Sequence, residues 1–256
     1  MCGIVGYTGF QDAYDIVING LRRLEYRGYD SAGIVLEDKN NNFEVKKTKG
    51  KVSDLVDISE NLKGTSHIGM GHTRWATHGV PSDRNSHPHV SNDGKIALVH
   101  NGIIENYDTI KTMLIGKGFT FLSETDTEVL VNLIQYILDT QNVDFPQAVR
   151  YALNEVYGAY AITVMHKDYP GVLVVGRLGS PLAIGLGDKE YFIASDASPF
   201  VEFTKEAVYL EDGHMATISL ENGVDIRSIK ENEKIEPAIQ ELKLSLEQIE
   251  KGGYEH

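Results

Sequence analysis

The arrangement of hydrophobic periodicity along the chain is the feature that most limits its fold. Helical spacing of apolar residues appears near the N-terminus, from Ala13 to Leu24, and again in a central block from Ile110 to about residue 155. Short strand-like runs lie at 3–7, 32–36, 43–47, 67–72 and 95–100, and seven more follow between 158 and 229. Because helices gather in the middle and strands lie on either side, the pattern favours a layered α+β fold over a doubly wound parallel sheet.

Three local signals refine this prediction. Thr125 and Glu128 have the spacing of a capping box, which predicts the start of a helix there. The stretch 73–94 is irregular, and a loop of that length inside a compact domain is usually functional. Apolar spacing after Pro237 predicts a C-terminal helix over 236–249, followed by a linker start. We therefore expect one domain over 1–235 and a helix with linker over 236–256.

Composition excludes several classes of protein. The 256 residues carry 24 basic and 37 acidic side chains, a net charge of −13, which argues against nucleic-acid and anionic-membrane partners. The single cysteine excludes a disulfide framework and is typical of a reducing cytosol. The sequence shows neither a signal peptide nor an apolar run of the ~18 residues that a membrane helix needs. The expectation is a cytoplasmic protein.

That single cysteine, Cys2, follows the initiator methionine and precedes Gly3. Removal of Met1 would place a thiol and a free α-amine on one residue, with ordinary pKa values near ~8.5 and ~7.7–8.0. The amine could then take the proton of the thiol directly or through one water, as in other N-terminal nucleophiles. A small apolar residue in a first strand is the competing interpretation of Cys2.

Three further motifs carry groups that an attack on an amide would need. Asn101 with Gly102 ends a strand-like run and could supply oxyanion donors, although Asn-Gly is also a common turn pair. Arg74 precedes the only tryptophan, Trp75, and its guanidinium suits a carboxylate. Asp126 lies at a predicted helix start, where a carboxylate is stabilised by the helix dipole. Each motif alone has an ordinary structural explanation.

Taken in order, the motifs MCGIVGY, LRRLEYRGYDSAGI (21–34), HTRWATHG (72–79), NSHPHV (85–90), HNGIIEN (100–106) and SETDTEV (123–129) are far more specific. Over roughly residues 1–250 the chain resembles the glutaminase domain of the glutamine–fructose-6-phosphate transaminase family. These proteins are class II amidotransferases with an N-terminal nucleophile. The resemblance implies a four-layer αββα sandwich, no cofactor and no metal.

The resemblance also implies roles for individual residues. Cys2 would be the nucleophile, and Asn101 with the backbone N–H of Gly102 would form the oxyanion hole. Arg74 would hold the α-carboxylate of glutamine, and Asp126 would hold its α-ammonium. The remaining residues around the pocket would be Thr77 and His78 beside the carboxylate, Arg27 and His87 as lining or bracing groups, and Trp75 in a loop closing over glutamine.

The implied partners are L-glutamine and L-glutamate. In the complete enzyme they also include two sugar-isomerase domains, which lie beyond this chain and use the ammonia to convert fructose 6-phosphate to glucosamine 6-phosphate. The resemblance further implies a homo-oligomer for the full-length enzyme.

Three other interpretations compete with this one. Six histidines fall in one stretch (67, 72, 78, 87, 89 and 100), which raises the possibility of a metal site, but acidic or cysteine ligands at known spacing do not accompany them. A module that senses glutamine without catalysis would keep Arg74 and Asp126 but would not need Cys2. A glutaminase domain of another class II amidotransferase is the third alternative.

Overall fold

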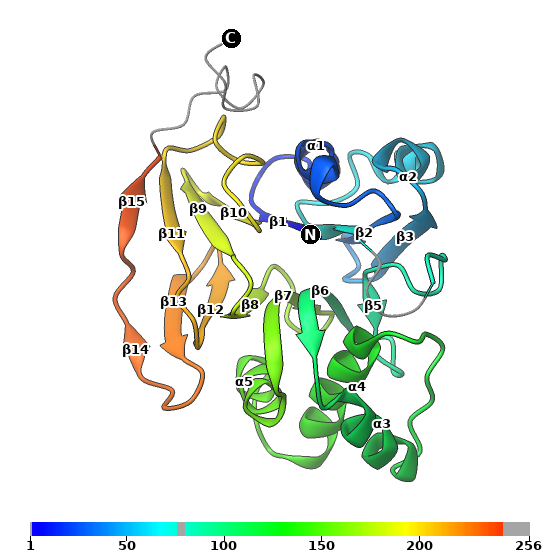
Figure 1. Cartoon of the computed structure of the whole chain (residues 1–256). Helices are drawn as coiled ribbons and strands as arrows, with labels where there is room; N and C mark the ends of the chain where they lie inside the picture. The colour runs from blue at the N-terminus through cyan, green and yellow to red at the C-terminus, as the bar shows by residue number, and fades with distance from the viewer. Residues whose placement is uncertain (1, 76–79, 243–256) are drawn as a thin grey trace.

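The chain folds into four layers, helix, sheet, sheet and helix (Figure 1). The computed structural model describes residues 2–75 and 80–242, so Met1, Thr77, His78 and the segment 243–256 lie outside the described residues. The helices α1 (Ala13–Leu24) and α2 (Val52–Ser59) cover one outer face. The helices α3 (Tyr107–Gly116), α4 (Asp126–Thr140) and α5 (Phe145–Glu155) cover the opposite face.

The first sheet contains the N-terminal strand near its centre, and its neighbouring strands pair antiparallel. In spatial order its strands are β15 (Ile239–Glu241), β11 (Glu206–Tyr209), β9 (Ala183–Gly187), β10 (Glu190–Ala194), β1 (Gly3–Thr8), β4 (Ile68–Arg74), β2 (Ser31–Glu37) and β3 (Phe43–Lys49). The register of β1 against β4 pairs Gly3 with Thr73, so the start of β1 lies beside the end of β4.

The second sheet is also antiparallel and lies between the first sheet and the helices α3, α4 and α5. In spatial order its strands are β14 (Lys234–Ile235), β13 (Gly223–Ser228), β12 (His214–Ser219), β8 (Leu173–Leu178), β7 (Gly158–His166), β6 (Ile96–Ile104) and β5 (His89–Val90).

Three hydrophobic cores separate the four layers, and strand alternation divides the side chains among them. In β1, Ile4 packs between the two sheets, whereas Val5 packs toward α1 and α2. In β6, Val99 packs between the sheets, whereas Leu98 packs toward α4 and α5. The same parity directs Asn101 to the space between the sheets and His100 to the helices.

Most elements predicted from the sequence are confirmed. The α+β class and the four-layer sandwich are both observed. The helix from Thr125 forms as α4, with the Thr125 hydroxyl accepting the Glu128 N–H. The central helical block, which was expected to end at about residue 155, ends with α5 at Glu155. Helix α2 was not predicted, because it has only eight residues and its apolar Val52, Leu55 and Val56 span little more than one turn.

Two expectations need correction. The helix expected over 236–249 is not formed in its described part, because Ile239–Glu241 instead pairs with Glu206–Tyr209 as an edge strand. Backbone hydrogen bonds offered by that sheet edge outweigh the apolar spacing. The loop expected over 73–94 is shorter at both ends, since β4 continues to Arg74 and His89–Val90 is a strand. No helix in the described part of the chain is long and apolar enough to cross a membrane.

Candidate active site

The Cys2 sulfur lies where the start of β1 meets the end of β4. The backbone N–H of Trp75 donates to Sγ of Cys2 at 3.2 Å, and the thiol is also 3.5 Å from the Trp75 carbonyl oxygen. Burial raises the pKa of the Cys2 thiol, while the Trp75 backbone hydrogen bond and the charges of Arg74 and Arg27 oppose that rise. A thiolate formed here would therefore find a donor and two nearby positive charges.

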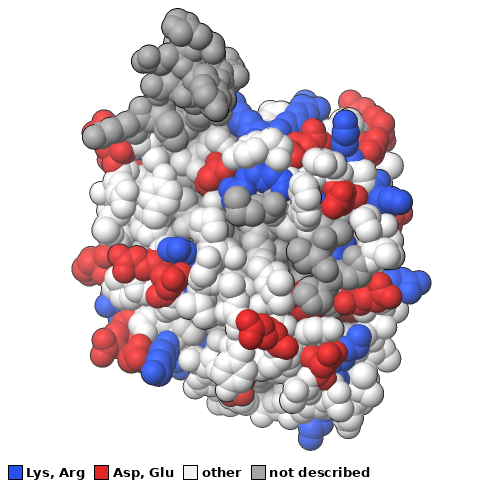
Figure 2. Space-filling view, viewed as in Figure 1, with Lys and Arg blue, Asp and Glu red and all other residues white. Residues whose placement is uncertain are grey.

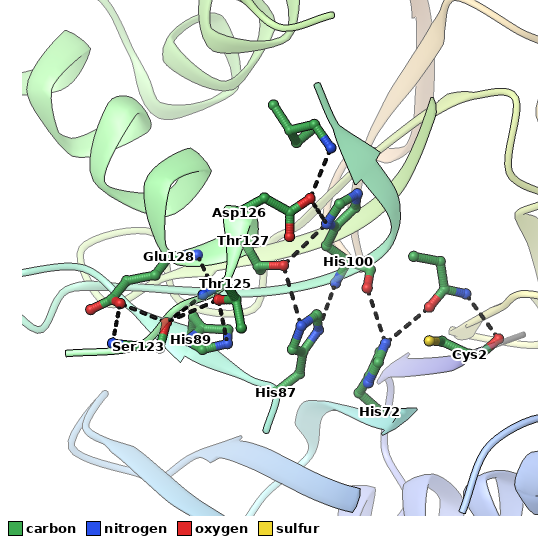
Figure 3. Close-up of polar contacts among 12 residues, drawn as sticks. Cys2, His72, His87, His89, His100, Ser123, Thr125, Asp126, Thr127 and Glu128 are labelled. Carbon is green, nitrogen blue, oxygen red and sulfur yellow. Dashed lines mark hydrogen bonds and ion pairs between the residues drawn. The ribbon is translucent and has the colours of Figure 1, made fainter. Parts of the chain in front are cut away.

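Asn101 projects from β6 toward the same point. Its Nδ2 donates to the carbonyl oxygen of Cys2 at 3.2 Å, and its Oδ1 lies 2.9 Å from Nε2 of His72 (Figure 3). Asn101 is 7% exposed, which leaves its amide at the edge of the cavity rather than in open solvent. The carboxamide donor of Asn101 thus faces Cys2.

Gly102 follows with a backbone φ of +125°, a conformation that side chains rarely adopt. A Cβ built there would lie 2.0 Å from the carbonyl oxygen of Ala159 on the neighbouring strand. Glycine is therefore required by both conformation and space.

Cys2, Asn101 and Gly102 line one cavity of about 320 Å³. Its other lining residues are Arg27, Trp75, Ile103, Ser180 and Pro181. Sequence analysis did not single out Ser180 and Pro181. They follow strand β8, and only a Gly-Ser-Pro turn signal marks them.

The two predicted pocket cations are positioned differently. Arg74 is the last residue of β4 and is buried, which lowers the pKa of its guanidinium, while Cys2, Asp126 and Asp30 raise it. Arg27 lies at the cavity and donates to Asp196 Oδ2 at 2.9 Å. Trp75 is 46% exposed, and its ring packs edge-on against the ring of Tyr29, with the two ring centroids 5.7 Å apart.

Asp126 begins α4 and is buried beside β6. Its Oδ2 accepts the backbone N–H of Ile104 at 2.8 Å and lies 3.9 Å from Nδ1 of His100. The carboxylate is therefore held against the strand that carries Asn101 and Gly102.

His87 lies against His72 and is not among the residues lining the cavity. Its ring stacks on His72 with centroids 4.1 Å apart, and its Nε2 contacts the Thr127 hydroxyl at 3.2 Å. Nδ1 of His87 accepts the backbone N–H of His100 at 3.3 Å. Figure 3 shows the rings of His72, His87 and His100 between Cys2 and Asp126.

The clustered histidines form hydrogen bonds with neighbouring groups. In the described part of the chain, their ring nitrogens do not converge on one point, as the ligands of a metal ion would. His89 contacts the Thr125 hydroxyl at 3.0 Å, and the exposed His67 contacts the Gln11 carbonyl. Within residues 2–75 and 80–242, no group of three or more His, Cys, Asp or Glu side chains is placed to hold a metal ion. His78, the remaining histidine of this stretch, lies outside the described residues, as does Thr77.

Comparison with known structures places this fold. The glutamine phosphoribosylpyrophosphate amidotransferase from B. subtilis superposes with a TM-score of 0.76 and 29% identity, over 90% of this chain and 50% of that one. A glutamine aminotransferase class-II domain protein from Silicibacter pomeroyi shares the fold with a TM-score of 0.59 at 15% identity. The four layers are thus those of amidotransferases of the N-terminal-nucleophile type.

Sequence comparison gives the family. The glutamine amidotransferase domain family matches residues 56–243, so the chain belongs to that family and is an enzyme domain. Two similar relatives are named glutamine–fructose-6-phosphate aminotransferase (isomerizing), from Bacteroides thetaiotaomicron and Chlorobaculum tepidum. Each is 51% identical over 100% of this chain, which spans only 42% of the relative's length.

Proposed function

We propose that this domain hydrolyses the side-chain amide of L-glutamine to L-glutamate and ammonia through a thioester on Cys2. The observation that carries the proposal is the convergence of Cys2, Asn101 and Gly102 on one cavity. The family supplies the class of reaction, and these three residues supply a nucleophile and oxyanion donors.

The free α-amine of Cys2 is the proposed base, which requires removal of Met1. The thiolate adds to the amide carbon of glutamine, and the carbonyl oxygen takes the negative charge. That charge is stabilised by the Asn101 amide and the backbone N–H of Gly102. Collapse of the adduct expels ammonia after protonation by the amine, and water then hydrolyses the thioester by the same steps in reverse order.

Substrate selection is proposed to rest on two buried charges. Arg74 would pair with the α-carboxylate of glutamine, and Asp126 would accept from its α-ammonium. Thr77 and His78 are proposed to assist Arg74, and Trp75 to cover the bound amino acid. Arg27 and His87 would hold the walls of the pocket through the contacts described above.

In the longer proteins that it resembles, we propose that such a domain supplies ammonia for making glucosamine 6-phosphate from fructose 6-phosphate. The names and lengths of the relatives support this step. We also propose that the full-length enzyme carries attached sugar-isomerase domains, forms a homo-oligomer and acts in the cytoplasm. The single cysteine is typical of a reducing compartment. On the face drawn in Figure 2, acidic and basic side chains are interspersed and form no continuous basic surface.

The experiment compares two preparations of the 256-residue protein, one beginning at Cys2 and one retaining Met1. Only the first should release ammonia from glutamine, because a retained methionine blocks the α-amine. Neither should convert fructose 6-phosphate to glucosamine 6-phosphate. Equal ammonia release by both preparations would contradict the proposed base, and glutamine binding without ammonia release by the first would indicate a sensing module instead.

A further inference from the structure

His72 is a buried side chain to which the proposed chemistry assigns no role. It lies on β4, two residues before Arg74, and is 1% exposed. His72 and Met70 are two residues apart on β4, so their side chains point to the same face of the sheet. His72 therefore lies in the space between the sheets, where it meets Asn101. It is not among the residues that line the cavity beside Cys2, and the cavity-lining Asn101 is its neighbour.

The hydrogen-bond partners of His72 determine its tautomer. Its Nε2 lies 3.0 Å from the backbone carbonyl oxygen of His100 and 2.9 Å from Oδ1 of Asn101. A backbone carbonyl can only accept, so Nε2 must carry the proton. Nδ1 of His72 has no hydrogen-bond partner in the described part of the chain, as expected for the unprotonated nitrogen.

The tautomer of His72 in turn determines the orientation of the Asn101 amide. A flipped amide would set its NH₂ group against the Nε2–H of His72, with two donors facing each other, so Oδ1 of Asn101 faces His72. The NH₂ group then faces Cys2, where it donates to the carbonyl oxygen at 3.2 Å. The flipped amide would place Oδ1 against that carbonyl and would present an oxygen to the developing oxyanion, which is repulsive.

The surroundings of His72 keep this arrangement fixed. Its ring stacks on His87 at 4.1 Å, and His87 is itself held by Thr127 and the backbone of His100. Burial lowers the pKa of His72 to about 3, and the Asn101 and His100 hydrogen bonds only partly oppose this. The ring therefore stays neutral, with one donor, across the pH range in which such an enzyme works.

We infer that His72 is a positioning residue, which holds the Asn101 amide with its NH₂ group toward the oxyanion. The inference rests on the proposed function, because it acts through the oxyanion role of Asn101. Without the His72 donor, the contact with the Cys2 carbonyl oxygen is the only one among the described residues that holds the Asn101 amide in the orientation that supports the reaction.

The test is a double-mutant cycle in the protein that begins at Cys2. His72→Phe keeps a stacking ring but removes the donor, and His72→Gln retains a donor. We expect His72→Phe to lower kcat by about 10–100-fold with little change in KM, because an oxyanion contact acts in the transition state. His72→Gln should recover part of the loss. His89→Phe is the matched control, since His89 also lies beside His87 but does not contact Asn101.

The decisive comparison is with Asn101→Ala. If His72 acts through Asn101, the double variant His72→Phe with Asn101→Ala should be no slower than Asn101→Ala alone. The positioning role would be wrong if the kcat loss of the double variant equalled the product of the two single losses. It would also be wrong if His89→Phe lost as much activity as His72→Phe. Full activity of Asn101→Ala itself would instead overturn the proposed oxyanion role and with it this inference. Thermal melting checks folding, and His72→Met replaces His72→Phe if the latter does not fold.

Discussion

The backbone N–H of Trp75 lies 3.2 Å from the sulfur of Cys2, although 73 residues separate them in the chain. The contact exists because β1 and β4 pair in a register that brings the first residues of one strand to the end of the other. A backbone donor at this position stabilises a thiolate and opposes the rise in pKa that burial causes at Cys2. The strand pairing itself therefore helps to activate the proposed nucleophile.

Replacement of the nucleophile should separate catalysis from folding. Cys2→Ala is expected to abolish ammonia release from glutamine and to leave the melting temperature nearly unchanged, because the side chain is small, is not fully buried and precedes the first residue of β1. An electrophilic glutamine analogue should label the wild-type protein once per chain, since Cys2 is the only cysteine. Mass spectrometry checks the label. Substantial ammonia release by Cys2→Ala would rule out the thioester mechanism.

Removal of an oxyanion donor should act on the rate rather than on binding. Asn101→Ala is expected to lower kcat by ~10²–10³, or about 2.7–4 kcal/mol in the barrier. The loss should appear in kcat and kcat/KM alike, because the contact strengthens in the transition state. Steady-state kinetics measures both. A rise in KM alone would identify Asn101 as a binding residue.

Substrate selection should depend on the guanidinium fork of Arg74. Arg74→Lys keeps the charge but loses the planar pair of donors, so the KM for glutamine should rise markedly. Asparagine is one methylene shorter, and such a mismatch typically costs roughly 10–200-fold in kcat/KM. Competition assays with both amino acids measure the ratio. Similar turnover of asparagine and glutamine would contradict the proposed pocket.

Trp75 should report ligand binding by fluorescence. It lines the cavity and is 46% exposed, so a bound amino acid should shield its ring and shift its emission to shorter wavelength. No other tryptophan contributes to the signal. Titration of Cys2→Ala with glutamine avoids turnover. An unchanged spectrum at a glutamine concentration that calorimetry shows to be saturating would exclude contact with Trp75.

Glu37 should make stability depend on pH at a distance from the site. Burial raises its pKa to about 7, and a hydrogen bond from the Gly171 backbone opposes that rise. Because the folded-state value exceeds the ordinary 4.5, its stabilising contribution is complete below pH 4.5 and is lost as the pH rises through about 7.

Glu37→Gln should therefore stabilise the protein at pH 8 relative to wild type, by up to about 3 kcal/mol, and should flatten this part of the pH profile. Urea unfolding at pH 4.5 and at pH 8 measures the difference. Glu44→Gln, at an exposed position on the neighbouring strand, is the control. An equal effect of Glu37→Gln at both pH values would contradict the assignment.

The sequence by itself determined those features that local periodicity encodes. The spacing of apolar residues from Ala13 to Leu24 predicted α1 at its observed residues, and the capping pair Thr125 and Glu128 marked the start of α4. Regular alternation of buried and exposed residues is a property of one segment, so it can be predicted without knowing the partner. The motifs around Cys2, Arg74, Asn101 and Asp126 indicated the same family that the comparisons give.

Only the tertiary structure decided which residues meet. The edge strand Ile239–Glu241 forms because β11 offers it unpaired backbone groups, a partner that its own spacing does not reveal. The role inferred for His72 depends on the backbone carbonyl of His100 and the amide of Asn101, which reach it from another sheet. Strand register brings together residues that are far apart in the chain, and these contacts then determine the tautomers of histidines and the orientations of amides. Local sequence patterns carry no information about such contacts or about the orientations that follow from them.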